Sequence, residues 1–361
     1  MKKIGKQVFF LPTNEQVKRN GEGAFIRLKD GRIMFGYTQY GSCGGDHDWA
    51  QLVAIYSCDE GETWSGPQVL LRPNDRDANI MSVSFLRMQN GDLGMFFLRK
   101  NQGNCRLHLV RSSDEGESWY DETVCCDEGY YVVNNDRVLR LKNGNILFPA
   151  NLHVSPDSSY SVQYMFCSED DGRTWKKLGQ PVCHPFPNSS TGLQESGIFQ
   201  FADESLWAWA RTRSGSQFMM FSKDGGTTWT MPCGSELFTG PDSPMQVKKA
   251  GPVTLAIFNP KPRYCGRIEL EPEETGKKLW ARTPFVCLAS RDGGKTFPEG
   301  YLLEDDPANA YCYPAIFEGE DYFLAAYYHS NDSGICLSSC KLTKVMYAEL
   351  DGGYPIKNST P

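Results

Sequence analysis

The sequence lacks the long hydrophobic runs that membrane spans and secretion signals require. Its first segment, MKKIGKQVFFLPTN, holds only a four-residue apolar run, Val8 to Leu11. No segment approaches the roughly 18 apolar residues of a membrane-spanning helix. No convincing amphipathic helical pattern interrupts the 361 residues either. We therefore expect a protein that is neither membrane-bound nor helical, and a cytoplasmic location.

The 13 cysteines lack the spacing of a metal site. No C-x-x-C pair occurs, and the adjacent Cys125 and Cys126 have no His or Cys at metal-ligand spacing. An odd number of cysteines cannot form a complete set of disulfides, and a chain without a secretion signal favours reduced thiols. We expect free cysteines that serve mainly as small buried hydrophobic residues, and neither a metal nor an organic cofactor.

The chain has no excess of positive charge. Its 37 Lys and Arg against 44 Asp and Glu give a net charge of −7, which disfavours nucleic acid and acidic membranes as partners. An anionic substrate would require a local cluster of arginines. With 40% hydrophobic residues, 35 Gly and 21 Pro, the composition is typical of a turn-rich globular protein.

One eight-residue pattern, Ser-x-Asp-x-Gly-x-Thr/Ser-aromatic, is present five times. Within such a turn the Asp and Ser side chains hydrogen-bond to backbone amides, Gly permits a positive φ, and the aromatic ring packs beneath. The pattern predicts a structural turn rather than a metal site. The five copies, spaced roughly 55 residues apart except for a longer last interval, are SCDEGETW (57–64), SSDEGESW (112–119), SEDDGRTW (168–175), SKDGGTTW (222–229) and SRDGGKTF (290–297).

A second element recurs between these turns: an apolar run, a polar turn and another apolar run, as in FIRLKDGRIMFGY. Such segments predict β-hairpins, and six of them can be counted, although VTLAIFNP shows only one clear strand. A hairpin followed by two strands joined by the repeated turn makes four strands per unit, the pattern of a propeller blade. We predict an all-β, six-bladed propeller that fills residues 1–361 as a single domain. The two ends, near KQVFFLP and KLTKVMYAEL, are expected to pair and close the ring.

Polar residues stand directly ahead of the predicted hairpins, where a propeller gathers its inner strands around a central funnel. A ring of such residues would make a polar binding site. A second set lies at the same end of the blades, where outer strands begin (Asp46, Asp48 and Arg282) or where a hairpin returns (Arg211). The residues ahead of the hairpins are Arg19, Asn79, Asn135 with Asp136, Glu195, Asp242 and Tyr311.

Five repeated turns on a six-unit chain resemble the sialidase (neuraminidase) superfamily, along the whole chain. The resemblance can be followed by spacing. Asp46 stands 11 residues before the first turn serine, Arg211 follows Glu195 by 16 residues, and Arg282 precedes the Asp of the last turn by 10. Tyr311, in Ala310-Tyr311-Cys312, matches the family's Ala-Tyr-Ser context, with Tyr313 as the less favoured substitute.

The family's first arginine is matched less closely. It usually opens an Arg-Ile-Pro motif, whereas this chain has Arg19-Asn20-Gly21, and Arg27 is the competing candidate. This departure bears on which sugar is bound more than on the reaction.

The resemblance implies a retaining exo-glycosidase acting on a terminal α-linked sialic acid or a related 2-keto sugar acid. A carboxylate nucleophile would be repelled by the substrate carboxylate, whereas a neutral tyrosine is not. Tyr311 would be the nucleophile, Glu195 its base, and Asp46, or Asp48 as its alternative, the acid/base group, with a raised pKa. The residues expected to bind the substrate are Arg19, Arg211 and Arg282 around the carboxylate, and Asn79, Asn135 and Asp136 at ring hydroxyls.

Two other functions fit the same sequence. A non-catalytic propeller of this kind would bind glycan or protein, and at least one catalytic position should then be broken. A hydrolase or lyase acting on another acidic sugar or a pentose chain would keep the fold, and its arginines should then not converge. The expected partner is a small molecule or a glycan with a terminal anionic sugar.

Overall fold

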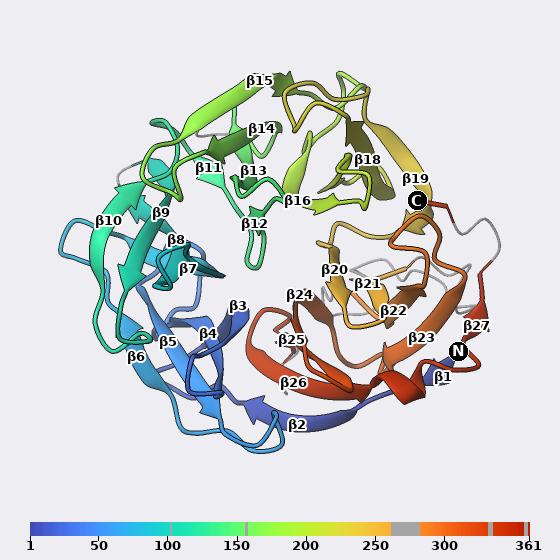
Figure 1. Ribbon diagram of the computed structural model, residues 1–361, viewed down its shortest axis with the longest axis horizontal. Coiled ribbons are helices and arrows are strands. Elements are labelled where there is room, and N and C mark those ends of the chain that lie inside the picture. The colour runs from blue at the N-terminus through green and yellow to red at the C-terminus, as the bar shows by residue number, and fades with distance from the viewer. Residues whose placement is uncertain (102, 156–157, 261–281, 331–334, 357–359) are drawn as a thin grey trace.

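The computed structural model describes residues 1–101, 103–155, 158–260, 282–330, 335–356 and 360–361. Its strands form six sheets that stand around a central axis as the blades of a propeller (Figure 1). Neighbouring strands within each four-stranded blade run antiparallel. The six-bladed, all-β prediction is therefore confirmed. In the described part of the chain, no helix is long and apolar enough to cross a membrane.

The strands follow the chain from the axis outward in each blade, except that the sixth blade takes its outer strand from the N-terminus. The first three blades are β3 (Arg19–Arg27), β4 (Ile33–Tyr40), β5 (Ala50–Ser57) and β6 (Gln68–Leu71); β7 (Asn79–Arg87), β8 (Leu93–Asn101), β9 (Asn104–Ser112) and β10 (Tyr120–Val124); and β11 (Tyr131–Val132), β12 (Leu139–Arg140), β13 (Ile146–His153), β14 (Ser161–Ser168) and β15 (Lys176–Val182). The last three are β16 (Gln194–Gln200), β17 (Leu206–Arg211), β18 (Ser216–Ser222) and β19 (Cys233–Thr239); β20 (Gln246–Ala250), β21 (Val253–Phe258), β22 (Phe285–Ser290) and β23 (Glu299–Glu304) with β1 (Lys2–Lys3) and β27 (Tyr354–Pro355) at its edge; and β24 (Tyr311–Glu318), β25 (Tyr322–His329), β26 (Ser339–Met346) and β2 (Lys6–Leu11), followed by the 3-10 helix η2 (Tyr347–Glu349).

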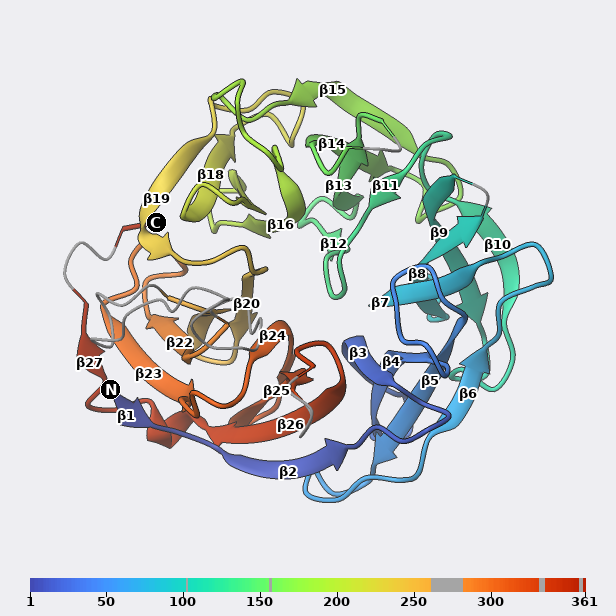
Figure 2. The ribbon, with the colours of Figure 1, turned by 180° about the vertical axis from the view of Figure 1, so that it is seen from behind.

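The ring closes through the two ends of the chain. β2 pairs antiparallel with β26, which places an N-terminal strand at the outer edge of the last blade, and both views of the ribbon show this seam (Figures 1 and 2). The closure follows the sequence prediction, since the strand lies within KQVFFLP. The weak fifth unit also forms a full hairpin, because the polar-looking β20 pairs with β21.

Hydrophobic side chains from adjacent blades meet between the sheets. Trp207 and Trp209 of β17, for example, are fully buried and pack with Phe238 and with residues of the next blade, Phe258 and Phe297. The five repeated turns join the two outer strands of the first five blades, and their aromatic residues contribute to these layers. The blades are therefore stabilised mainly by contacts between sheets, which leaves the axial end of each strand available for polar residues.

Each repeated turn is held together by its own Ser and Asp. In the first copy, Ser57 Oγ accepts a hydrogen bond from Gly61 N at 2.9 Å, and Asp59 accepts from Thr63 N at 2.9 Å and Thr63 Oγ1 at 2.6 Å. The same bonds recur in the other four copies. The hydrogen bonds from Thr63 lower the pKa of Asp59 to about 2. This geometry supports a purely structural role for the turns.

We expect Asp59→Ala to lower the free energy of unfolding by about 1–2 kcal/mol at pH 7, because three hydrogen bonds to a carboxylate are lost. A carboxyl group whose pKa is lower in the folded state stabilises the fold above its unfolded pKa of about 3.9, and this stabilisation fades as pH falls toward 2. Urea unfolding should thus show a smaller difference between variant and wild type at pH 3 than at pH 7. Asp75→Ala on an exposed loop is the control, and equal differences at both pH values would contradict the prediction.

Candidate functional site

Four inner strands carry a β-bulge at the same point, and each bulge holds a non-glycine residue in the left-handed region. Pairing shifts register between Gly21 and Ala24, Met81 and Ser84, Gln194 and Gly197, and Cys312 and Ala315. The residues with positive φ at these shifts are Glu22 (53°), Ser82 (59°), Glu195 (45°) and Tyr313 (58°). Such strained bulges are concentrated at functional sites because they redirect a side chain out of the regular alternation.

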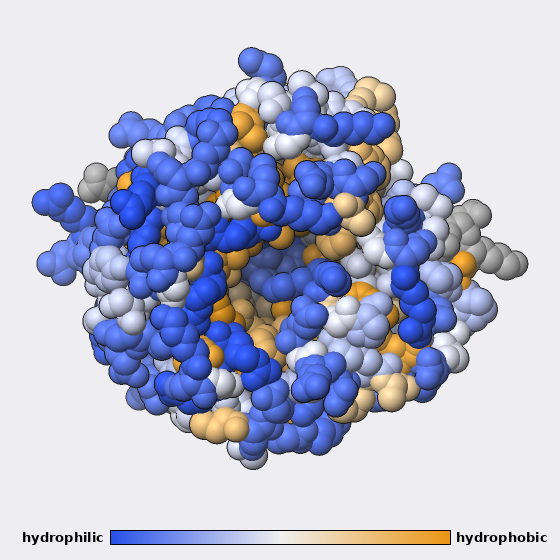
Figure 3. Space-filling view, viewed as in Figure 1, coloured by the Kyte–Doolittle hydropathy of each residue, from blue (hydrophilic) through white to orange (hydrophobic). Residues whose placement is uncertain are grey.

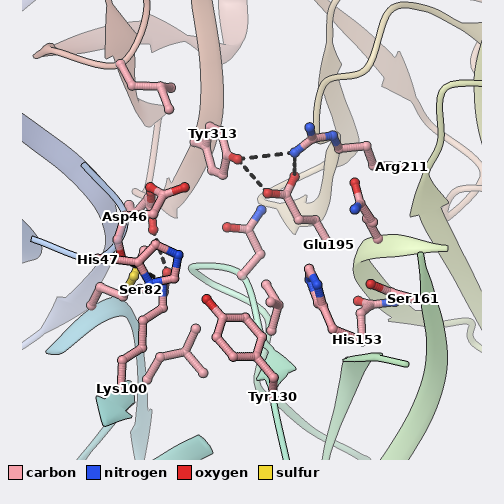
Figure 4. Close-up of a pocket in the computed structure, with 18 of the residues that line it drawn as sticks. Asp46, His47, Ser82, Lys100, Tyr130, His153, Ser161, Glu195, Arg211 and Tyr313 are labelled. Atoms are coloured by element: carbon pink, nitrogen blue, oxygen red, sulfur yellow. Dashed lines mark hydrogen bonds and ion pairs between the residues drawn. The ribbon is translucent and has the colours of Figure 1, made fainter. Parts of the chain in front are cut away.

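All four bulge residues line one pocket of about 410 Å³ at the axial end of the blades. The space-filling view shows a hollow at the centre of the ring, with hydrophilic residues on its walls (Figure 3). The close-up shows Tyr313, Glu195 and Arg211 converging on one side of the pocket, apart from Asp46, His47 and Lys100 (Figure 4). The bulges thus explain how residues from separate blades reach a common cavity.

Tyr313, Glu195 and Arg211 form a closed group within this pocket. The Tyr313 hydroxyl donates to Glu195 Oε1 at 2.5 Å, and Arg211 Nη1 lies 2.6 Å from Glu195 Oε2 and 3.3 Å from the Tyr313 hydroxyl. The Asp242 carboxylate accepts hydrogen bonds from Arg211 Nε and from Arg213 Nε, and so fixes the Arg211 guanidinium. Burial and then the charge of Glu195 raise the pKa of Tyr313, against the opposing charges of Arg211 and Arg282. The phenol is therefore neutral, with a carboxylate positioned to take its proton.

Tyr311 does not occupy the position that the sequence predicted for it, and that prediction is wrong. Its ring is 1% exposed and packs in the hydrophobic core against Phe285, Tyr327 and His329. The bulge after Cys312 explains the error, because it turns Tyr313 toward the axis. The sequence offered no local signal that separates the two tyrosines, because the shift arises from the pairing of β24 with β25.

Arg282 lies in the same pocket wall as Arg211. Its guanidinium carbon is 5.7 Å from the centre of the Tyr313 ring, and its Nη2 donates to the Asp242 carbonyl at 2.9 Å. Within the part of the chain that the structure describes, no carboxylate pairs with Arg282, and its buried Nε has no hydrogen-bond partner. A buried cation without an acidic partner is suited to an anionic ligand.

Arg19 lies beside the pocket rather than in its lining. It donates to the Tyr328 hydroxyl at 2.7 Å and to Asp46 Oδ1 at 2.5 Å, binds Glu22, and stacks over the Tyr40 ring at 4.2 Å. Glu22 and Asp46 both line the pocket, so the Arg19 guanidinium is separated from the pocket only by the two carboxylates that it binds. The competing candidate, Arg27, lies at the other end of β3 and pairs with Glu60 of the first repeated turn.

Asp46, and not its alternative Asp48, reaches the pocket. Asp48 instead stabilises its own loop, where its Oδ2 accepts from Gly45 N at 2.6 Å. Partial desolvation opposes ionisation of Asp46, although its side chain is 58% exposed, but the charges of Arg19 and Lys100 and the hydrogen bond from Arg19 outweigh it and lower the pKa to about 2. The sequence-based expectation of a raised pKa is therefore wrong for this state of the protein, because Arg19 is bound directly to the carboxylate.

Three polar residues expected at sugar hydroxyls serve the scaffold instead. The Asn79 amide donates to the carbonyls of Asp46 and Asp48, at 2.8 and 2.9 Å, and so fixes the loop that carries Asp46. The Asn135 amide donates to the Gly23 carbonyl, and Asp136 pairs with Lys248 at 2.8 Å. None of the three is in the pocket lining. The Asn79 and Asn135 amide nitrogens and the Asp136 carboxylate bond to other segments of the scaffold, while the buried Asn79 Oδ1 has no hydrogen-bond partner among the described residues. Strand order alone does not reveal these contacts.

The pocket contains other polar residues that the sequence did not single out for this role. Lys100, which is 6% exposed, donates to the Asp46 carbonyl at 2.8 Å and lies beside the Tyr130 ring. These side chains come from β8, β13 and the start of β16, from the segments on either side of β11, and from the loops that follow β4 and β17. The additional polar lining residues include His47, Lys100, Tyr130, Asn134, Asn151, His153, Gln194 and Arg213. In the described residues, no three His, Cys, Asp or Glu side chains gather as a metal ion would require.

The comparisons with known proteins agree with the fold. Residues 31–329 match the model of the BNR repeat-like domain family. No curated protein matches the chain at a significant level. A Dyadobacter fermentans protein of unknown function is similar in structure, with a TM-score of 0.71, 16% identity, and coverage of 94% of this chain and 99% of the other.

Two solved sialidase-type structures are similar to the same extent. The NanB sialidase of Streptococcus pneumoniae has a TM-score of 0.71 at 13% identity, over 96% of this chain and 71% of the other. The intramolecular trans-sialidase of Ruminococcus gnavus has a TM-score of 0.70 at 13% identity, over 96% and 98%. At this identity the likeness concerns the fold. The family match covers most of the chain, so this protein belongs to the BNR repeat-like domain family and has the six-bladed propeller fold that sialidases share.

Proposed function

We propose that the protein is a retaining exo-glycosidase of sialidase type, which releases a terminal α-linked sialic acid or a related 2-keto sugar acid. The observation that carries this proposal is the hydrogen bond between the Tyr313 hydroxyl and Glu195, bridged by Arg211. A neutral phenol can attack an anomeric carbon that bears a carboxylate without charge repulsion, while Glu195 takes the phenolic proton.

Arg211 and Arg282 are the residues best placed to bind the substrate carboxylate. Both line the pocket beside Tyr313, and among the described residues Arg282 has no acidic partner. A carboxylate held between them would sit next to the attacking oxygen. This arrangement supports an anionic sugar as substrate, because its carboxylate can pair with a buried guanidinium that no described carboxylate neutralises.

Asp46 is the proposed acid/base residue, and Arg19 controls its protonation. With the pKa lowered to about 2, Asp46 is ionised in the free protein and cannot donate a proton near neutral pH. If the substrate carboxylate held by Arg211 and Arg282 also reaches Arg19, it competes for the Nη1 that now binds Asp46. Loss of that contact would raise the pKa of Asp46, so that the residue could protonate the leaving oxygen and later activate water.

The proposed function is tested by incubating the protein with an aryl α-sialoside and following the products by NMR. Release of the α-anomer first, before mutarotation, would show hydrolysis with retention. An anhydro sugar as first product would keep the Tyr313 mechanism but change its second half. Binding of the free sugar acid without any turnover would favour a non-catalytic glycan-binding propeller.

Replacing Arg282 with Lys should raise KM at least about 10-fold with a smaller change in kcat, because an ammonium cannot reproduce the planar guanidinium donors. Steady-state kinetics on the aryl sialoside measures both constants. Arg27→Lys is the matched control, since Arg27 pairs with Glu60 on the far side of the blade. An unchanged KM for Arg282→Lys would remove this residue from the carboxylate site.

A further inference from the structure

Two thiols adjoin Arg282 at the wall of the pocket. Cys312, on β24 next to Tyr313, is fully buried, while Cys336 is 7% exposed and lines the pocket. Their sulfur atoms are 4.0 Å apart, and Arg282 Nη1 lies 3.1 Å from Cys312 Sγ and 3.9 Å from Cys336 Sγ. The proposed chemistry at Tyr313 uses neither thiol.

This environment favours an anionic sulfur at Cys336. The hydrogen bond from Cys312, together with the positive charge of Arg282, lowers the pKa of the Cys336 thiol, although burial opposes the shift. Arg19 contributes to the same field, and burial raises the pKa of Cys312. A thiolate at Cys336 would provide the counter-charge for Arg282 when no substrate carboxylate is bound. A thiolate that faces a cavity is also the form of cysteine that reacts with oxidants.

We propose that Cys312 and Cys336 form a redox-active thiol pair, which hydrogen peroxide converts to a disulfide that takes Arg282 out of its substrate-binding geometry. The Cys336 thiolate attacks one peroxide oxygen, so that an S–O bond forms as the O–O bond breaks and the sulfur becomes a sulfenic acid. The departing hydroxide takes up a proton and leaves as water. The Cys312 thiol then attacks the sulfenic sulfur, the S–S bond forms, and a second water leaves. Two electrons pass from the thiol pair to the peroxide, and an external dithiol reverses the change.

The disulfide would act on Arg282 through position. Bond formation brings the two sulfurs about 2 Å closer together than they are now, since an S–S bond is about 2.05 Å long. The sulfur atoms that now contact Arg282 Nη1 at 3.1 and 3.9 Å must move for this bond to form, so the contacts that orient the guanidinium change. The guanidinium is expected to reorient, and substrate affinity to fall. This consequence for turnover rests on the proposed function, whereas formation of the disulfide does not.

Mapping of cysteine oxidation tests the pair directly. The full-length protein is purified under reducing conditions, treated with hydrogen peroxide, blocked with N-ethylmaleimide in denaturant and digested with chymotrypsin. Tyr322 and Tyr328 give cleavage between the two cysteines, and Leu337 separates Cys336 from the nearby buried Cys340. We expect a linked pair of peptides that contain Cys312 and Cys336, with Cys340 alkylated before and after oxidation. Alkylation of Cys312 and Cys336 after peroxide treatment would overturn the proposal.

Two variants separate a specific pair from general oxidation. In Cys312→Ser, which keeps a hydrogen-bond donor beside Cys336, Cys336 should stop at the sulfenic acid, which dimedone labels, and in Cys336→Ala no linked peptide should form. Cys183→Ser removes an exposed thiol elsewhere and should behave as the wild type. Dimedone labelling of exposed cysteines alone, with none at Cys336, would also overturn the proposal.

Activity measurements then test the consequence. Peroxide should lower the wild-type rate on the aryl sialoside at least 10-fold, and dithiothreitol should restore it, whereas Cys336→Ala should keep its own rate after peroxide. Equal losses in both proteins would overturn the regulatory part. Failure of the reduced wild type to turn over the sialoside would count against the proposed function, and the peptide map would still decide the thiol pair.

Discussion

Tyr313→Phe is expected to lower kcat by about 10³-fold or more, because it removes the proposed nucleophilic oxygen and with it the covalent route. The ring itself should remain in place, since its contacts with Tyr328 and Arg282 do not involve the hydroxyl. The variant should therefore fold normally and still bind the sugar acid through Arg211 and Arg282. Steady-state kinetics, circular dichroism and isothermal titration with the free sugar acid give the three measurements.

Tyr311→Phe is the matched control, two residues away on the same strand. Tyr311 lies in the core, so this variant should change kcat little, although its stability can shift. Glu195→Gln should resemble Tyr313→Phe, and the double variant should be no worse than either single one, because the two groups act as a unit. The mechanism fails if Tyr313→Phe turns over the substrate at nearly the wild-type rate or if Tyr311→Phe is the inactive variant.

Asp46→Asn is expected to produce a loss that depends on the leaving group. An alkyl or sugar aglycone needs a proton as it departs, so the rate on a sialyl-oligosaccharide should fall by about 10²–10⁴-fold. An aryl leaving group such as nitrophenolate departs without help, so the rate of bond cleavage on the aryl sialoside should fall much less. Rates on the two substrates, each measured for variant and wild type, test the assignment through their ratio.

Asp48→Asn is the control for this comparison, because Asp48 belongs to the same loop but bonds to Gly45. It should affect both substrates equally and modestly. Equal losses on both substrates for Asp46→Asn would instead indicate a role in holding Arg19, with which Asp46 forms an ion pair. The acid/base assignment would then have to move elsewhere in the pocket, where Glu22 is the other carboxylate that contacts Arg19.

The fold could be predicted from the sequence because its determinants are local. The Ser, Asp and Gly of each repeated turn satisfy one another within eight residues, and the hairpins follow from alternating apolar runs around polar turns. The pairing of Glu195 with Arg211 was also accessible, since the two flank one hairpin, where Gln194 faces Arg211.

The identity of the tyrosine at the site was decided by tertiary structure. The sequence placed Tyr311 in the funnel, whereas a register shift of the inner strand turns Tyr313 inward and leaves Tyr311 among core aromatics. A bulge depends on how a strand pairs with its neighbour and packs against the next blade, so residue spacing within the strand does not determine it.

The ionisation of Asp46 and the structural role of Asn79 could likewise not be predicted from the sequence. Both depend on partners far away in the chain, since Arg19 binds the Asp46 carboxylate and the Asn79 amide holds the Asp46 carbonyl. The sequence by itself determined the repeated turns, the hairpins and the ring, because these follow from contacts within a blade. Only the tertiary structure decided which polar groups reach the pocket and which form hydrogen bonds within the scaffold, because that depends on strand register and on contacts between segments distant in the sequence.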